Sequence, residues 1–371
     1  MYVPGRPMLP GVTLDLLQDS PALTARLVDE ESVSGEEARL AEAIASALSG
    51  LPYLSVRRDG NAIVARTSLG RPERVILAGH IDTVPVAGNL PARFTSGDGE
   101  TGGRLYGCGT TDMKSGVAVQ LRLAATVAEP ARDVTYVFYD CEEVEAERNG
   151  LLRLSRNHPD WLEGDFAVLM EPTDGVVEGG CQGTLRAEVR VPGERAHSAR
   201  SWMGRNAIHD AAGVLDRLRR YQAREPEVEG LRYHEGLNAV GISGGVAGNV
   251  IPDSCVITVN FRFAPDRSEE QAAQHVREVF SGWEVVVTDH APAARPGLRH
   301  PAAASFLDAV GAAPRAKLGW TDVARFDALG IPAVNYGPGI PEIAHTRGEY
   351  VELPRITGCE DRMRSWLTAA P

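Results

Sequence analysis

The sequence predicts an α/β fold, in which a mostly parallel sheet is flanked by helices and a smaller α+β domain is inserted. Two observations support this prediction: apolar strand-like runs alternate with helical segments in the first part of the chain, and this pattern changes near Gly180. Strands that alternate with helices indicate a parallel sheet covered on both faces. The alternating pattern returns near the C-terminus, so we expect the larger domain to be built from two separate parts of the chain.

In the first part of the chain, the expected helices begin at local capping signals. Ser20-Pro21 places a cap and an N1 proline before a helix over Ala22–Glu30. Ser34 and Glu37 have the spacing of a capping box before a helix over Ala38–Leu48. Strand-like runs then follow at Ala62–Thr67, Arg74–Ala78, Val134–Tyr139 and Phe166–Leu169. Between the second and third of these runs, a glycine-rich loop at Gly107–Gly116 leads into a helix at Val117–Ala128.

The inserted part has the pattern of a compact unit with two helices on a four-stranded antiparallel sheet. Its expected strands are Thr184–Val191, Leu237–Ser243, Ser254–Phe263 and Glu284–Thr288. Its expected helices are Asn206–Tyr221 and Ser268–Phe280. A proline-rich linker at Ala291–Pro301 then leads back to a strand at Ile331–Asn335 and a C-terminal helix. We therefore predict a discontinuous domain of residues 1–180 and 291–371, and an inserted domain of residues 181–290.

Composition excludes several classes of function. The chain has 371 residues, of which 43% are hydrophobic and 24% are charged, as in ordinary globular proteins. Its net charge of −12, without a basic stripe, argues against nucleic acid as a partner. No apolar run approaches the roughly 20 residues of a membrane span, and Met1 to Asp19 lacks the pattern of a signal peptide. Five cysteines without Cys-x-x-Cys spacing suit a reducing compartment, so we expect a soluble, cytoplasmic protein.

The most informative motif is the segment Gly79–Pro85, which directly follows the apolar run Val75–Ala78. A His and an Asp two residues apart in extended chain point to the same side. His80 can therefore bind a metal ion while Asp82 holds its other ring nitrogen. Alone, a His-x-Asp pair is a weak signal, because a His at a loop start can be held by an Asp without any metal.

Further acidic and His residues lie beside predicted strands or glycine loops, namely Asp112, Glu142, Glu143, Glu171 and His345. Each has an ordinary explanation by itself, such as a helix N-cap for Asp112 or a solvated acidic loop for the paired glutamates. Ligands of an open parallel sheet bind beyond the carboxyl ends of its strands, so we expect these residues in one crevice. Buried carboxylates require cations, and two His with three carboxylates suit two zinc or cobalt ions. The remaining Glu can then act as a general base.

These motifs make the chain similar to the co-catalytic zinc peptidase and deacylase family M20, over nearly its whole length. The likeness rests on Gly-His-Ile-Asp-Thr-Val-Pro, Thr-Asp-Met-Lys-Ser-Gly at 111–116, the paired glutamates and the late His345. The resemblance implies two Zn²⁺ ions, with Co²⁺ as a possible substitute. His80 and Glu171 would bind one ion, and Glu143 and His345 would bind the other. Asp112 would bridge the two ions. It also implies that Asp82 orients His80 and that Glu142 is the general base.

The resemblance includes the inserted domain, which would serve as a lid and dimerisation domain. Arg195–Ala199 looks like the family's lid motif, whose His197 reaches the neighbouring subunit's site and stabilises the oxyanion; a homodimer is therefore implied. The residues implied to contact the substrate are Arg200, Asn249, Arg262, Thr321 and Arg325. A polar turn around His197 and a surface salt bridge for Arg262 remain the alternative explanations from the residues alone.

Within the family, three segments are most similar to succinyl-diaminopimelate desuccinylases: Phe138–Glu143, Gly180–Thr184 and Lys317–Phe326. This likeness implies hydrolysis of the amide bond of N-succinyl-LL-2,6-diaminopimelate to succinate and LL-2,6-diaminopimelate. Acetylornithine deacetylase or another N-acyl-amino-acid amidohydrolase is the alternative. A dimeric binding protein without catalysis is a third hypothesis. The complete set of ligands, together with Glu142, argues against it.

Overall fold

The computed structural model describes residues 12–97 and 102–370. The chain divides into two compact units, here called unit 1 and unit 2. They consist of Met1–Gly179, Gly297–Arg315 and Arg325–Pro371, and of Gly180–Pro296 and Ala316–Ala324, respectively. The domain limits expected from the sequence stay a prediction, and these units differ from them by assigning residues 180, 291–296 and 316–324 to unit 2. Most of the N-terminal stretch judged not to be a signal peptide lies outside the described residues.

Unit 1 is built on a mixed sheet, whose described strands have the order β1-β2-β6-β3-β7-β18-β8-β17. The strands are β1 (Ser55–Asp59), β2 (Ala62–Arg66), β3 (Arg74–His80), β6 (Asp133–Tyr139), β7 (Phe166–Leu169), β8 (Glu178–Gly179), β17 (Arg315–Ala316) and β18 (Ala333–Asn335). Strands β6, β3, β7 and β18 are parallel, whereas β1, β2 and β8 pair antiparallel with their neighbours. The predicted α/β fold with a mostly parallel sheet is confirmed at the centre, and antiparallel strands flank it.

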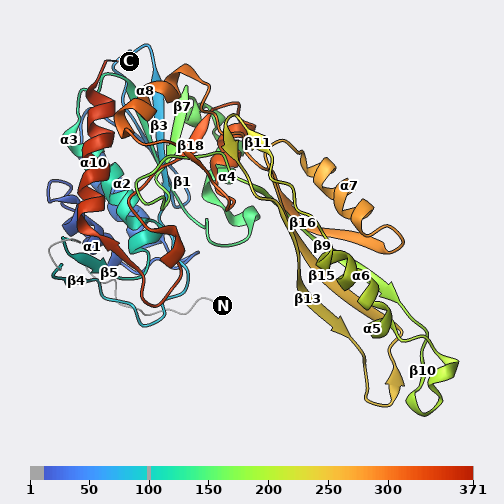
Figure 1. Cartoon of the computed structure of the whole chain (residues 1–371). Coiled ribbons are helices and arrows are strands. Elements are labelled where there is room, and N and C mark those ends of the chain that lie inside the picture. The colour runs from blue at the N-terminus through green and yellow to red at the C-terminus, as the bar shows by residue number, and fades with distance from the viewer. Residues whose placement is uncertain (1–11, 98–101, 371) are drawn as a thin grey trace. The chain divides into compact units, whose positions relative to one another are not determined.

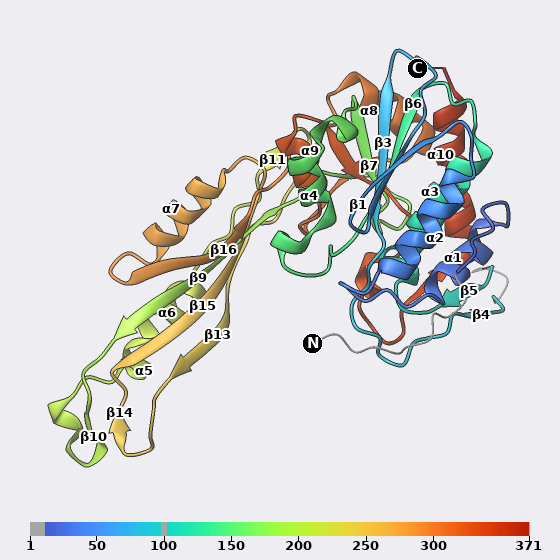
Figure 2. The same cartoon turned by 180° about the vertical axis from the view of Figure 1, so that it is seen from behind.

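Helices cover both faces of this sheet, which is why its central strands are nearly continuous apolar runs. One face shares a hydrophobic core with α1 (Ser20–Val28), α2 (Ala38–Ser49), α3 (Ser115–Thr126), α8 (Pro301–Val310) and α10 (Leu353–Thr368). Figures 1 and 2 show α2, α3 and α10 on that face and α4 (Gly150–Asn157) on the opposite one. The chain returns from unit 2 to unit 1 for the last time between Ala324 and Arg325, within α9 (Val323–Ala328).

A small sheet in unit 1 joins the C-terminal part of the chain to the loop that precedes α3. Its strands have the order β19-β5-β4 and comprise Tyr350–Glu352, Arg104–Tyr106 and Arg93–Thr95, respectively. After β5 the chain passes through a π-helical segment, Thr110–Lys114, directly into α3. Short 3₁₀ helices occur at Ala146–Arg148, Pro159–Leu162 and Pro341–Ile343.

Unit 2 contains a four-stranded antiparallel sheet in the order β13-β15-β9-β16. These strands comprise Gly236–Gly244, Ser254–Phe263, Gly183–Pro192 and Glu284–Ala291, respectively. Alternate residues of β9 and β15 pack against α5 (Ala207–Asp210), α6 (Ala212–Arg219) and α7 (Glu269–Val279), so one sheet face carries the helices. Smaller elements are the pairs β10 (Ala196–His197) with β14 (Val250–Ile251) and β11 (Glu227–Val228) with β12 (Leu231–Arg232), and a 3₁₀ segment at Ser198–Met203.

Two predictions of helix boundaries were wrong. Asp19 rather than Ser20 is the N-cap of α1, and its carboxylate accepts a hydrogen bond from the Ala22 amide. Because Pro21 has no amide hydrogen, Ala22 offers the first amide that a side chain here can cap. The single long helix expected in the insert is divided at Ala211 into α5 and α6. Apolar periodicity alone could not show this division, since both pieces keep the same buried face.

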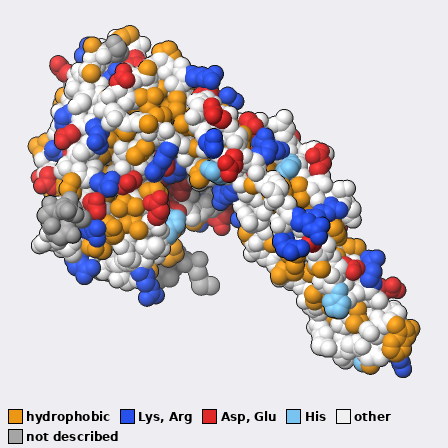
Figure 3. All heavy atoms as spheres, viewed as in Figure 1, with side chains coloured by type: hydrophobic (Ala, Val, Ile, Leu, Met, Phe, Trp, Pro, Cys, Tyr) orange, Lys and Arg blue, Asp and Glu red, His pale blue; other side chains and the backbone are white. Residues whose placement is uncertain are grey.

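The surface of the molecule carries charges of both signs. Figure 3 shows acidic and basic side chains intermingled on the visible face. All five cysteines are free and buried. In the described part of the chain, no helix is both long enough and apolar enough to cross a membrane.

Candidate metal centre

The candidate site begins where the central parallel strands end. His80 is the last residue of β3, and its register partner on β6 is Tyr139. Glu142 and Glu143 follow Tyr139 after three and four residues. Since β3 and β6 are parallel, their carboxyl ends lie at the same edge of the sheet, and the glutamates follow directly beyond that edge.

Glu171 follows the neighbouring strand on the other side of β3. The register pairs Ala78 of β3 with Leu169 of β7. Glu171 thus comes two residues after Leu169, just as His80 comes two residues after Ala78, and its side chain is buried. The fold therefore brings Glu171 to the sheet edge at which His80 stands.

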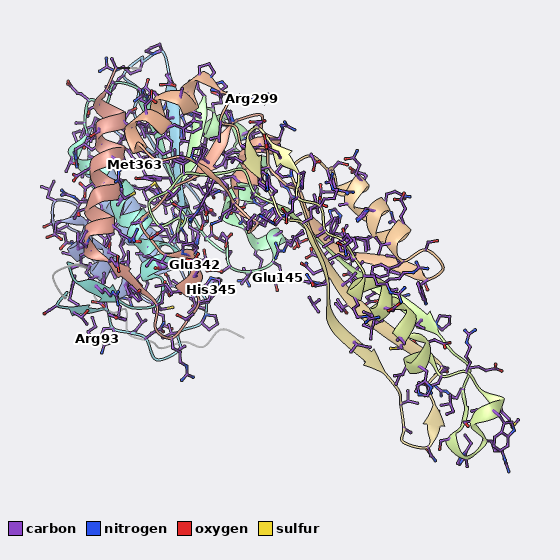
Figure 4. All side chains as sticks on the ribbon, viewed as in Figure 1. Arg93, Glu145, Arg299, Glu342, His345 and Met363 are labelled. Atoms are coloured by element: carbon purple, nitrogen blue, oxygen red, sulfur yellow. The ribbon has the colours of Figure 1, made fainter. Side chains whose placement is uncertain are left out.

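Four of the predicted ligands form one cluster of side chains. His80 Nε2 lies 3.1 Å from Asp112 Oδ1, and His345 Nε2 lies 3.3 Å from Asp112 Oδ2. His345 Nε2 is also 2.7 Å from Glu143 Oε1. Figure 4 shows His345 on its loop, with Glu145 on a neighbouring loop of unit 1. The two oxygens of Asp112 thus face two different histidines.

Electrostatics within this cluster favour positive charge. Hydrogen bonds that His345 donates to the carboxylates of Asp112 and Glu143 raise the pKa of His345 to about 10. Burial alone would lower the pKa of His80, but Asp112 and Asp82 outweigh it and raise that pKa well above its usual value. Burial likewise opposes the charge of Asp112, yet His345 and His80 hold the pKa of Asp112 far below its usual range. Without metal, the cluster therefore holds protons between its carboxylates.

The donor set fits a transition-metal centre. Imidazole nitrogens and carboxylate oxygens are the ligands of zinc and cobalt sites, and a divalent cation can take the place of the protons held by the histidines. The ligand atoms of His80, Asp112 and Glu143 lie within 4.8 Å of one another. Together with the two faces of Asp112, this arrangement can accept a cation on either side of one carboxylate.

A second group of potential ligands in unit 1, formed by Glu37, Asp140 and Cys141, does not share this character. Arg153 already pairs with Asp140, with 2.7 Å between Nη2 and Oδ1. Glu37 Oε1 accepts hydrogen bonds from the amides of Gly35 at 2.6 Å and Cys141 at 3.3 Å. Because these carboxylates already have partners, the group needs no metal ion.

Asp82 forms hydrogen bonds with several segments that carry the proposed ligands. Its Oδ1 accepts the amide of Glu142 at 3.0 Å, and its Oδ2 accepts the amide of Glu143 at 3.1 Å. His80 Nδ1 lies 3.1 Å from the carbonyl oxygen of Asp82 and 3.4 Å from Oδ1. The main chain of Asp82 is thus the nearer partner of the imidazole, while its carboxylate holds the glutamate loop. That Asp82 orients His80 stays a prediction.

The prediction that Ser34 and Glu37 form a capping box is wrong. The N-cap of α2 is Glu37, which makes no side-chain cap. Instead, the Ser34 hydroxyl donates to Asp82 Oδ2 at 2.7 Å, and the buried Glu37 binds the loop of Cys141. Both side chains thus have long-range partners beside the site, which a local sequence pattern cannot reveal.

Cys141 is unsuited to nucleophilic chemistry. Burial, reinforced by Glu37 and Asp140, raises the pKa of its thiol to about 12.

Cys141 and His345 are also non-glycine residues with positive φ, at 57° and 62°. Such backbone conformations cluster at functional sites, where the surrounding structure holds them in place.

Glu349 is a further residue that the sequence analysis missed. It is buried, and its carboxylate accepts amide hydrogen bonds from the loop that carries Asp112. Burial raises the pKa of Glu349 to about 7, although those amides oppose the rise. Its only signal in the sequence is its position four residues after His345.

In unit 2, the structure brings two predicted site residues together. His197 and Val250 are partners in the β10–β14 pair, and the Ser198 amide donates to the carbonyl oxygen of Asn249 at 2.9 Å. His197 Nδ1 accepts the Ala199 amide at 3.0 Å. In neutral imidazole one nitrogen accepts and the other donates, so this bond leaves the proton of His197 on Nε2.

The remaining predicted substrate residues occupy different elements. Arg200 is exposed in the 3₁₀ segment after β10, and Thr321 is buried in unit 2. Arg325 belongs to α9 in unit 1. Arg262 lies on β15 between the inward-facing Phe261 and Phe263, so its side chain is on the face without helices. Burial and Arg186 lower the pKa of Arg262.

Comparison with known proteins gives matches over nearly the whole chain. The model of the peptidase family M20/M25/M40 matches residues 76–369. A relative from Mycobacterium tuberculosis (strain CDC 1551), provisionally named succinyl-diaminopimelate desuccinylase DapE, is 55% identical over 95% of this chain and 99% of its own. The succinyl-diaminopimelate desuccinylase of Corynebacterium glutamicum is 47% identical over 96% of this chain and 98% of its own. A tripeptidase structure from Staphylococcus aureus has a TM-score of 0.78 at 20% identity, over 96% and 98%, which shows the fold alone.

Proposed function

Because the chain belongs to the peptidase family M20/M25/M40, we propose that it is a metal-dependent succinyl-diaminopimelate desuccinylase. It hydrolyses the amide bond of N-succinyl-LL-2,6-diaminopimelate to succinate and LL-2,6-diaminopimelate, a step of lysine and diaminopimelate biosynthesis. One observation carries the proposal: the cluster around Asp112 occurs in a chain that is 55% and 47% identical, over nearly its full length, to relatives named for this activity.

We assign two Zn²⁺ ions to this centre, with Co²⁺ as a possible substitute. His80 and Glu171 would hold one ion, Glu143 and His345 the other, and Asp112 would bridge both. The geometry of Asp112 supports this assignment, since its Oδ1 faces His80 and its Oδ2 faces His345. The raised pKa values of the two histidines support it too, because they report carboxylates that favour a neighbouring cation.

The residues around the centre have distinct roles in hydrolysis. When bound, the ions lower the pKa of a water molecule and polarise the amide carbonyl of the substrate. Glu142 accepts the proton of the attacking water and passes it to the departing amine. Asp82 holds the backbone of Glu142 in place through the amide hydrogen bond at 3.0 Å. No covalent enzyme intermediate is required, in keeping with the high pKa of the Cys141 thiol.

We propose that His197 stabilises the oxyanion in the active site of a neighbouring subunit. Its Nδ1 already accepts the Ala199 amide, so Nε2 carries the proton and can donate to a negatively charged oxygen. One donor of this kind is typically worth about 3 kcal/mol of transition-state stabilisation. Replacing His197 by Ala should therefore lower kcat by about 100-fold and leave metal binding unchanged.

The substrate carries several carboxylates, for which we propose Arg200, Asn249, Arg262, Thr321 and Arg325 as binding residues. Arg262 has the strongest support. In the described residues it has no acidic ion-pair partner within 4 Å, and the charge with the largest effect on its pKa is that of the cation Arg186. A partly buried guanidinium in this state favours a carboxylate ligand, because bidentate Arg–carboxylate pairs give both attraction and orientation.

We further propose a homodimer formed through unit 2. Strand β13 is at the edge of its sheet and exposes Val240 (60%) and Ile242 (56%). Trp202 and Met203 are also exposed next to β10, where Figure 3 shows hydrophobic side chains at the end of unit 2. An exposed apolar edge strand is a template for pairing with another chain. Replacing Ile242 by Lys should shift the protein from dimer to monomer in light scattering, whereas an unchanged mass would contradict this interface.

We place the protein in the cytoplasm on the basis of its cysteine chemistry. All five cysteines are free, which suits a compartment that keeps thiols reduced. Fractionation of cells that express the tagged full chain tests this, and recovery outside the cytoplasmic fraction would contradict it.

The decisive experiment compares kcat/KM of the zinc-loaded protein on N-succinyl-LL-2,6-diaminopimelate and on N-acetylornithine. We expect a preference of about 100-fold for the succinyl substrate, which equals about 2.7 kcal/mol of discrimination. The opposite preference would reassign the protein to the acetylornithine deacetylases with the same metal chemistry. Activity on neither substrate, with both ions bound, would overturn the proposal and favour a binding protein.

A further inference from the structure

The buried carboxylate of Glu349 holds the loop that presents Asp112. Glu349 is 2% exposed. Its Oε1 accepts the amides of Thr111 at 2.8 Å and Asp112 at 3.1 Å, and its Oε2 accepts the amide of Gly109 at 2.9 Å. One side chain thus receives three main-chain hydrogen bonds from a single short loop.

The same segment binds that loop through its main chain. The Gly107 amide donates to the carbonyl oxygen of Glu349 at 3.2 Å. The Thr111 hydroxyl donates to the carbonyl oxygen of Tyr350 at 2.6 Å, where β19 begins beside β5. Main chain and side chain of Glu349 therefore fix the loop from both ends.

Glu349 also connects two of the proposed ligands. His345 lies four residues before it in the chain, and Asp112 lies on the loop that it binds. His345 Nε2 and Asp112 Oδ2 are 3.3 Å apart. The separation of these two side chains therefore depends on how Glu349 joins their segments.

A carboxylate is suited to this position for a clear reason. Asp112 and Met113 have non-helical φ and ψ values, so the loop does not satisfy its amides through regular helical hydrogen bonds. The amides of Gly109 and Thr111 are buried and that of Asp112 is partly buried; three such amides that point at one place need an acceptor with several lone pairs, which an ionised carboxylate provides. A glutamine there would offer one oxygen and would turn its NH₂ group toward at least one amide.

From this geometry, and on the basis of the metal centre proposed above, we infer that Glu349 is a positioning residue for that centre. It holds Asp112 between the two histidines and thereby sets the affinity for the metal ions. Glu349 does not touch the ions or the substrate. Its contribution is made through the backbone of residues 109–112.

The test compares metal binding by the full-length wild type and by Glu349→Gln. Metal-free protein is titrated with Co²⁺, and binding is followed by visible absorption and by calorimetry. We expect the dissociation constant of the more weakly bound ion to rise by about 10- to 100-fold, as for other residues that support metal ligands. We also expect the absorption spectrum of the bound Co²⁺ to change, because the position of Asp112 changes.

Asp133 offers a matched control in the same unit. It is 4% exposed, and its carboxylate accepts the amides of Leu69 at 2.8 Å and Arg71 at 3.0 Å. It begins β6, at the end of the strand opposite to Tyr139 and the site. Asp133→Asn removes a buried acceptor of backbone amides in the same way. It should lower the midpoint of urea unfolding but leave the Co²⁺ dissociation constants and spectrum unchanged.

Several outcomes would overturn the inference. Unchanged Co²⁺ affinity and spectrum in Glu349→Gln would do so, as would an equal loss of affinity in Asp133→Asn. If Glu349→Gln does not fold, Glu349→Asp keeps the charge with a shorter reach, and wild-type affinity in that variant would also contradict the inference. Failure of the proposed activity is distinguishable, because it would show as wild-type protein that binds Co²⁺ without hydrolysing the succinyl substrate.

Discussion

Replacing Asp82 by Asn removes the charge at the hydrogen-bonding centre of the site while keeping the size of the side chain. The carboxylate of Asp82 is fully buried. It accepts the Glu142 amide at 3.0 Å on Oδ1, and the Ser34 hydroxyl at 2.7 Å and the Glu143 amide at 3.1 Å on Oδ2. An Asn side chain has one acceptor oxygen, so its NH₂ group must face the amide of Glu142 or of Glu143 in either orientation.

The expected loss of stability follows from these contacts. An amide left without an acceptor in a buried position costs about 1–3 kcal/mol. The hydrogen bonds that remain also lose their charge assistance, which roughly halves their strength and adds about 1 kcal/mol. We therefore expect the free energy of unfolding of the metal-free protein to fall by about 2–4 kcal/mol. Metal affinity should fall by about 10- to 100-fold, because Asp82 contacts the segments of His80 and Glu143.

Urea unfolding of the metal-free protein and Zn²⁺ calorimetry measure the two quantities separately. Ser34→Ala is the graded control, since it removes one donor and leaves both amides bound to the Asp82 carboxylate; its cost should be about 1 kcal/mol. A loss below 1 kcal/mol in Asp82→Asn, with zinc affinity within about twofold of wild type, would refute this reasoning. Equal losses in the two variants would also refute it, because the glutamate amides would then contribute nothing.

Three further predictions address the base, a ligand and the core. Glu142→Gln should lower kcat by about 100- to 10,000-fold with unchanged zinc stoichiometry, and full activity in steady-state assays would show that another group is the base. The pKa of His345 is raised to about 10 from 6.5, so its charged form stabilises the metal-free fold below about pH 6.5, and this contribution is lost as the pH rises toward 10. The melting temperature of the metal-free protein should therefore fall between about pH 6.5 and pH 10, and it should fall by less in His345→Ala. Equal falls in the two proteins would contradict the raised pKa of His345. Arg132 is fully buried, pairs with Glu73 at 2.7 Å and lies over the ring of Trp366. Arg132→Met should therefore lower the free energy of unfolding, measured with urea, by about 3 kcal/mol. An unchanged free energy would show that the ion pair contributes nothing to stability.

Much of the site was predictable because its residues stand directly next to strands. The apolar run before His80 and the run before Glu142 were recognised as strands from hydrophobicity alone, and the structure has them as the parallel neighbours β3 and β6. Once strands are parallel, the residues after them meet at one edge of the sheet. The roles of these residues, and of Glu171 at the end of β7, remain proposals that metal binding and kinetics can test.

The supporting residues could not be predicted, because their partners are distant in the sequence. Ser34 and Glu37 have the spacing of a capping box, but the hydroxyl of Ser34 binds Asp82, 48 positions further along the chain. A capping pattern describes only neighbours within one turn, and a stronger acceptor from another segment can replace them. The same limit applies to the long helix expected in the insert, which is divided at Ala211.

The sequence by itself determined the α/β class, the family and the kind of side chains available for a metal centre, since these depend on local hydrophobic periodicity and on residue identity. Only the tertiary structure decided which oxygen of Asp112 faces which histidine, and that Glu349 binds the loop around Asp112. Glu349 and Gly109 are 240 residues apart, and no local pattern links them. Their contact arises because the pairing of β19 with β5 brings two distant segments together, and buried amides there require an acceptor.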